Sequence, residues 1–92
     1  MYLEIVSPEA TLFAGEVTSV TVPGINGEFQ MLKDHAPIVS LLQEGKVKVA
    51  GNITLDKDYA SKFTKDAAGN TVLEISSGTI ELKNNKVIVL AD

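Results

Sequence analysis

Apolar and polar residues alternate along most of this chain, which is the pattern of β-strands that bury one face in a core. Glycine, proline or asparagine separates the alternating runs, as turns require. The apolar pairs that share a face are Leu3/Ile5, Val20/Val22, Phe29/Met31, Val47/Val49, Ile53/Leu55, Leu73/Ile75 and Ile80/Leu82. The pattern predicts an all-β fold, an antiparallel two-sheet β-sandwich that resembles a flattened barrel.

Two breaks in the alternation predict where the strands change direction. Val17 and Val20 differ in parity, so we expect a β-bulge near Thr18–Ser19. Ile75 and Ile80 differ in the same way, with a glycine between them. There we expect a bulge or a sharp corner at which the chain crosses from one sheet to the other.

Three segments do not follow the alternation. Val87–Leu90 is apolar on both faces, which predicts either a central strand covered by a loop or a docking surface for another protein. Ile38–Leu42 fits a buried strand or a single amphipathic turn equally well. Because Pro37 disfavours helix at Ala36, we interpret this segment as a strand. Within residues 57–65, Tyr59 and Phe63 lie four apart, so a short helical turn competes there with an irregular hairpin loop.

Composition limits the class of protein. With 92 residues, of which 45% are hydrophobic, the chain predicts a single domain over residues 1–92. The net charge is −4 and all eight basic residues are lysine, a poor match for a phosphate backbone, so we expect no nucleic-acid partner. No apolar run approaches the roughly 20 residues of a membrane span. We therefore expect a soluble, intracellular chain that does not span the membrane.

Candidate chemistry is sparse. The only histidine, His35, follows Asp34, but adjacent residues on a strand point to opposite faces, which disfavours a catalytic triad. A metal site needs three or four clustered ligands, and the carboxylates here are dispersed. We expect no catalytic residue, no metal and no cofactor. The segment Gly24–Gly27 lacks the Gly-Lys-Ser/Thr of a phosphate-binding loop, and with Pro23 it predicts a tight type II turn.

Three short motifs follow one another in the chain. The central motif joins Pro-Gly-x-x-Gly-Glu at residues 23–28 to His-Ala-Pro at residues 35–37. Residues 3–17 precede it and residues 78–92 follow it. In this order and spacing the motifs resemble the epsilon subunit of F-type ATP synthase, leaving mainly the segment 51–70 without a match. Two positions depart from the family pattern. Lys33 stands where the family most often has proline, and Gln30 stands where glycine is common.

The resemblance implies a function for the whole domain. Epsilon subunits are non-catalytic central-stalk subunits that bind the gamma subunit and the polar loops of the c-ring, and so couple ion-driven rotation to ATP synthesis. This implies a hetero-oligomeric complex, peripheral to the cytoplasmic face of the bacterial inner membrane. The family typically continues into two C-terminal helices that inhibit ATP hydrolysis. Because this chain stops at Asp92, the resemblance predicts a short form without that inhibitory element.

The resemblance also implies two sets of contact residues. The set expected to face the c-ring loops is Gly27, Glu28 and Phe29. The set expected to meet the gamma subunit is Ser7, His35, Ala36, Ile38, Ser40, Ser77 and Gly78. We regard Glu28 and His35 as the strongest candidates, because several of the others could serve only to build the sandwich.

Two other classes of function compete with this interpretation. A small all-β ligand-binding or adaptor module unrelated to ATP synthase usually offers exposed aromatic rings, but this chain has no tryptophan and two tyrosines. An enzyme is disfavoured by the isolation of His35. Binding to the gamma subunit without any turnover distinguishes a stalk subunit from both.

Overall fold

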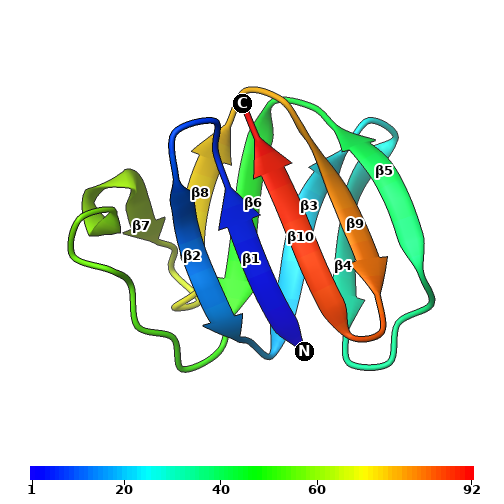
Figure 1. Ribbon diagram of the computed structural model, residues 1–92, viewed down its shortest axis with the longest axis horizontal. Coiled ribbons are helices and arrows are strands. Elements are labelled where there is room, and N and C mark those ends of the chain that lie inside the picture. Colours follow the sequence, from blue (N-terminus) through cyan, green and yellow to red (C-terminus); the bar gives the residue numbers. More distant parts are fainter.

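The computed structural model describes residues 1–92 and contains ten β-strands and one short 3₁₀ helix (Figure 1). The elements are β1 (Tyr2–Val6), β2 (Thr11–Glu16), β3 (Ser19–Gly24), β4 (Gly27–Leu32), β5 (Ile38–Leu42), β6 (Gly45–Ala50), η1 (Ala60–Lys62), β7 (Phe63–Lys65), β8 (Thr71–Ile75), β9 (Gly78–Lys83) and β10 (Lys86–Ala91). The predicted all-β class is confirmed. No helix of the structure is long and apolar enough to cross a membrane.

The strands form one curled sheet that folds into two layers. Its order is β2-β1-β10-β9-β5-β3-β6-β8-β7, and β4 pairs with β3. Figure 1 shows β2, β1, β10, β9 and β5 in front of the layer that contains β8, β6, β3 and β4. The two layers join along one side through a single residue pair, Gly24 with Leu42. The sequence predicts an antiparallel sandwich, and the structure departs from this prediction at one pair of strands, β1 and β10, which run parallel.

The core fills the space between the two layers. Alternate residues of each strand point inward, as the sequence pattern predicts, and both layers supply fully buried side chains. Those with almost no exposed surface include Leu3, Ile5, Val20, Val22, Met31, Val47, Ile80, Leu82, Val87 and Val89. Full burial of each such side chain contributes roughly 1.5–3 kcal/mol, so this core is the main source of stability.

The two predicted changes of direction have different outcomes. The expected bulge near Thr18–Ser19 is wrong: the chain there passes from β2 in the front layer to β3 in the back layer, which accounts for the parity change. The register shift lies instead in β2, where Ile5 pairs with Phe13 and Val6 pairs with Thr11. The predicted corner between Ile75 and Gly78 is confirmed, because β8 pairs with β6 and β9 pairs with β10.

The segment between β6 and β8 differs most from expectation. Ile53 and Leu55 do not form a strand, although both are half-buried and pack against the core. Leu55 shares a hollow with residues 11–14 of β2, an edge strand of the sheet, but does not pair with it. The helical turn expected over residues 57–65 is confined to η1, Ala60–Lys62, because Phe63–Lys65 pairs with β8 as a strand.

Candidate functional site

The β3–β4 hairpin carries the predicted c-ring residues, 27–29. Strand β3 continues through Pro23 and Gly24, and Gly24 pairs with Gly27, so the connection is the two-residue loop 25–26. The type II turn predicted at Pro23 and Gly24 is therefore wrong. The positive φ lies on Gly27, at 123°, a conformation that residues with a β-carbon rarely adopt.

Glu28 and Phe29, which follow in β4, have different environments. The Glu28 side chain is 53% exposed, and its Oε2 lies 3.4 Å from Nζ of Lys48 on β6. An exposed ion pair of this kind contributes little stability, so the carboxylate stays available to a partner. Phe29 is half-buried and packs against the core, which favours a structural role for its ring.

His35 lies in the exposed loop between β4 and β5. The backbone N–H of His35 donates to the Leu32 carbonyl at 3.2 Å, which closes a turn over residues 32–35. Asp34 has a φ of 64°, as the third position of a type II turn requires. The turn thus forms with Lys33, not proline, in its second position. His35 Nδ1 lies 2.7 Å from the Ala36 carbonyl, which can only accept, so Nδ1 carries a proton and Nε2 is the acceptor of the neutral ring.

Along β5 the predicted contact residues lie on the inward face, and the exposed residues lie on the outward face. Ile38 packs against the core, and Ser40 and the buried Leu42 share its face of the strand. Val39 and Leu41 face outward, with 76% and 59% of their surface exposed. Sequence reasoning missed these two residues. Strict alternation back from a buried Leu42 could have found them.

Ser77 and Gly78 lie at the corner between β8 and β9. Ser77 Oγ donates to Asp92 Oδ2 at 2.5 Å, which ties the corner to the end of β10. A β-carbon at Gly78 would overlap the carbonyl oxygen of Leu90. The close approach of β9 and β10 at this point therefore requires glycine.

A shallow hollow on the front layer joins this corner to strands β5 and β10. Its lining residues are Ile25, Leu41, Leu42, Ser77, Gly78, Thr79, Leu90 and Asp92. Leu41 and Leu90 both pair with Thr79, so their side chains lie on the same face of the sheet. We call the exposed residues Ile25, Val39, Leu41 and Leu90 the outer apolar face. Contiguous apolar surface of this kind marks an interaction site.

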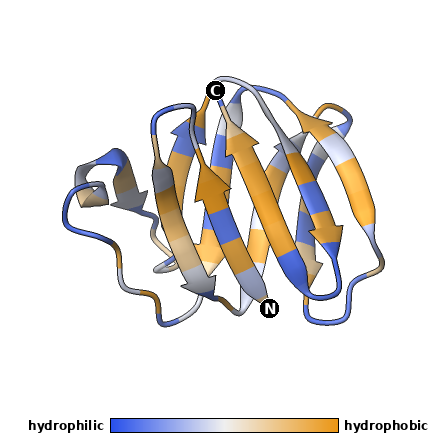
Figure 2. Cartoon of the chain, in the orientation of Figure 1, coloured by the Kyte–Doolittle hydropathy of each residue, from blue (hydrophilic) through white to orange (hydrophobic).

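Strand β10 explains the apolar run Val87–Leu90. It is a central strand, between β1 and β9, and its inward residues Val87 and Val89 are fully buried. Figure 2 shows hydrophobic colour along most of β10, with nothing drawn over it. Half of the Leu90 surface is exposed, so the predicted covering loop is wrong and the docking alternative fits the outward side.

The predicted contact residues divide between the two ends of the sandwich. His35 and Ala36 follow the end of β4, beside the β9–β10 turn in Figure 1. Glu28 lies at the start of β4, at the end that also carries Ser77 and Gly78. The structure therefore does not bring the predicted gamma residues together in one place.

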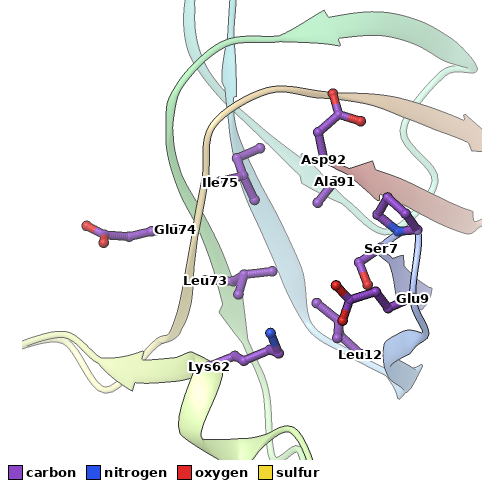
Figure 3. A pocket seen from close by; sticks show the side chains of 10 residues that line it. Ser7, Glu9, Leu12, Lys62, Leu73, Glu74, Ile75, Ala91 and Asp92 are labelled. Carbon is purple, nitrogen blue, oxygen red and sulfur yellow. The ribbon is translucent and has the colours of Figure 1, made fainter.

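A second hollow opens beside the β1–β2 turn (Figure 3). Buried Leu12, Leu73 and Ile75 contribute to its lining, and the side chains of Lys62 and Glu9 point toward it in Figure 3. The chain's one histidine, His35, is not among its lining residues.

Ser7 also lines this hollow, but its groups close the β1–β2 turn. Its Oγ donates to the Ala10 carbonyl at 3.2 Å and accepts from the Ala10 N–H at 3.3 Å. No three His, Asp or Glu side chains in the structure come together in a way that could hold a metal ion.

Comparison with known proteins gives consistent matches over the full chain. The family model for the "ATP synthase, Delta/Epsilon chain, beta-sandwich domain" matches residues 1–92. The chain is 37% identical over 90 residues to the ATP synthase epsilon chain of Chlorobaculum tepidum, covering 98% of this chain and 86% of that protein. It is 34% identical to the epsilon chain of Caulobacter vibrioides over 92 residues, covering 100% of this chain and 90% of that protein.

Solved structures show the same fold at lower sequence identity. A chain of the Tetrahymena thermophila mitochondrial ATP synthase central stalk and c-ring aligns with a TM-score of 0.72 and 11% identity, covering 99% of this chain. A chain of the Euglena gracilis mitochondrial ATP synthase aligns with a TM-score of 0.71 and 18% identity, covering 97% of this chain. This chain spans 62% and 48% of the length of those two chains.

Proposed function

Because this chain belongs to the ATP synthase epsilon family, as a delta/epsilon β-sandwich domain, we propose that it is a non-catalytic subunit of the central stalk. It binds the gamma subunit and the polar loops of the c-ring, and so couples ion-driven rotation to ATP synthesis. It works as a peripheral member of the complex at the cytoplasmic face of the membrane.

The observation that carries this proposal is the separation of its two strongest contact candidates, Glu28 and His35. Glu28 is the second residue of β4 and His35 follows the end of that strand, so the two side chains lie toward opposite ends of a molecule measuring 32 × 26 × 25 Å. The outer apolar face begins at the Glu28 end, where Ile25, Leu41 and Leu90 line one hollow, and Val39 continues it along β5 toward the His35 loop. A subunit that touches two partners at once needs separate surfaces of this kind.

For the gamma subunit, we assign the outer apolar face together with His35 and Ala36. The fully buried core of an interface is more apolar than the rest of the surface, and Leu41 and Leu90 offer apolar side chains beside Ser77 and Gly78. The predicted contacts Ile38 and Ser40 face the interior, so we assign them the role of holding β5 in place. Ser7 supports the turn beside β1 in the same indirect way.

For the c-ring loops, we assign the hairpin at Gly27, Glu28 and Phe29. The Glu28 carboxylate is exposed and can accept hydrogen bonds from a basic or amide group. Gly27 provides the positive φ that the turn needs, and Phe29 anchors the hairpin on the core. Of the three, only Glu28 is expected to contribute a specific polar contact.

Two alanine variants test whether the regions serve different partners. His35→Ala should weaken binding to the purified gamma subunit, whereas Glu28→Ala should leave that binding unchanged and lower ion-driven ATP synthesis in the reconstituted enzyme. Glu9→Ala, which removes another exposed carboxylate, is the matched control. If both variants behave like the control while the wild-type chain binds gamma, the residue assignment is wrong. A loss of the thermal unfolding transition in either variant would also count against a contact role.

A further inference from the structure

The exposed loop between β4 and β5 is tied to the β9–β10 turn by two hydrogen bonds. The Asp34 N–H donates to Asn85 Oδ1 at 2.8 Å, and Asn85 Nδ2 donates to Asp34 Oδ1 at 3.1 Å. The two residues are 51 positions apart in the chain. The other hydrogen bonds of the loop, made by His35, stay within residues 32–36. The placement of this loop against the sandwich therefore depends on one residue pair.

Both members of the pair occupy backbone conformations that favour glycine. Asp34 has a φ of 64° and Asn85 a φ of 60°, in the left-handed region where aspartate and asparagine are the usual non-glycine residues. Asn84 and Asn85 form a two-residue hairpin connection with positive φ at both positions, which glycine would satisfy equally well. Glycine at position 85 would lack the amide that reaches Asp34. The reciprocal hydrogen bonds explain why side chains stand at these positions.

We propose that Asp34 and Asn85 are positioning residues that hold the His35 loop in the conformation presented to the gamma subunit. This inference rests on the proposed function above. A loop that samples many conformations binds more weakly, because only the competent fraction can bind and the rest must first become ordered. The clamp keeps the competent fraction high from a turn that need not touch gamma itself.

The test compares Asn85→Gly with Asn84→Gly in this 92-residue chain. Glycine accepts the positive φ at either position, so both variants should keep their unfolding temperature near that of the wild type. Only Asn85→Gly breaks the clamp. Asp34→Gly removes only the bond from Asn85 Nδ2 to Asp34 Oδ1 and keeps the backbone N–H that donates to Asn85 Oδ1, so its effect should be smaller than that of Asn85→Gly. For each protein, nuclear magnetic resonance measures hydrogen exchange at the residue 34 amide and order parameters through residues 34–36. Calorimetric titration then measures the affinity for purified gamma subunit.

Asn85→Gly removes both hydrogen bonds of the clamp, including the acceptor of the residue 34 amide. We expect exchange at that amide to rise about two- to tenfold and gamma affinity to fall by a similar factor. Asn84→Gly should change neither. Unchanged exchange and order in Asn85→Gly would overturn the clamp. A released loop with unchanged gamma affinity would overturn its role in binding. A wild-type chain that fails to bind gamma would instead overturn the proposed function, while the exchange data would still decide whether the pair orders the loop.

Discussion

Individual residues with special backbone requirements set much of the local geometry in this sandwich. Gly78 permits β9 to approach the Leu90 carbonyl, and Gly27 supplies the positive φ that ends the β3–β4 loop. Glycine between two alternating runs correctly predicts a turn. The pattern places that turn at Pro23 and Gly24, two residues before the observed loop at residues 25–26. The sequence could not reveal this, because proline is compatible with both the turn and the end of a strand.

At Gly78, substitution by alanine should destabilise the domain by about 3 kcal/mol, because β9 or β10 must move to make room for the new methyl group. Gly69→Ala is the matched control. Gly69 has a φ of 86° but open space around it, so this substitution should lower the free energy of unfolding by only about 1 kcal/mol. Urea unfolding followed by circular dichroism measures both. If Gly78→Ala costs no more than Gly69→Ala, the close contact is wrong.

At Asp66, the structure predicts a dependence of stability on acid. Hydrogen bonds from the Asn70 backbone, the Asn70 side chain and the Ala68 backbone hold the pKa of this carboxyl below its ordinary value. A depressed folded-state pKa gives stability that is present above the unfolded-state pKa and is lost as the pH falls through the folded-state value. The loss should therefore occur below about pH 4.

The measurement for Asp66 is the urea midpoint at a series of pH values from about 5 to about 2. Asp66→Asn retains an oxygen for the backbone hydrogen bonds but cannot titrate, so its midpoint should fall less steeply with acid. Asp56→Asn is a suitable control, because Asp56 also accepts a backbone hydrogen bond, from Asp58. Equal acid slopes for the wild type and Asp66→Asn would contradict the prediction.

At the scale of elements, alternation predicts where most strands lie, but it does not predict which face of a strand is buried or which strands pair. The strand over Ile38–Leu42 is confirmed, yet the contact side chains predicted on it face inward. Alternation assigns residues to two faces without saying which face is covered. Ile53 and Leu55 alternate like a strand but pair with none, although the edge of β2 beside Leu55 is free. Whether a segment pairs with an edge depends on contacts distant in the chain, which local pattern does not contain.

Adjacent leucines on β5 test the assignment of its faces. Leu42→Ala, at a buried position, should lower the free energy of unfolding by about 2–5 kcal/mol, whereas Leu41→Ala should change it by about 0.5 kcal/mol or less. For gamma binding, Leu41→Ala should weaken affinity about tenfold or more as the loss of an apolar anchor. Chemical unfolding and titration of both variants provide the check. Similar stability losses in the two variants would contradict the assigned orientation of β5.

At the scale of the whole molecule, one curled sheet brings together segments that are distant in the chain. The parallel pairing of β1 with β10 places the two ends of the chain in neighbouring strands, which alternation alone could not predict. The family motifs correctly predict the sandwich, but the outer apolar face becomes visible only when β5 and β10 are placed on either side of β9. The surfaces that remain uncovered are the ones that we propose bind partners.

The most direct test of the central claim is calorimetric titration of this chain into the purified gamma subunit of the same organism. An interface of about 800 Å² per partner with apolar anchors is sufficient for stable association, so we predict saturable binding with a dissociation constant below about 1 μM. Leu41→Ala should reduce that affinity while Glu28→Ala should not. A folded wild-type chain that shows no binding to gamma would contradict the assignment of this domain to the central stalk.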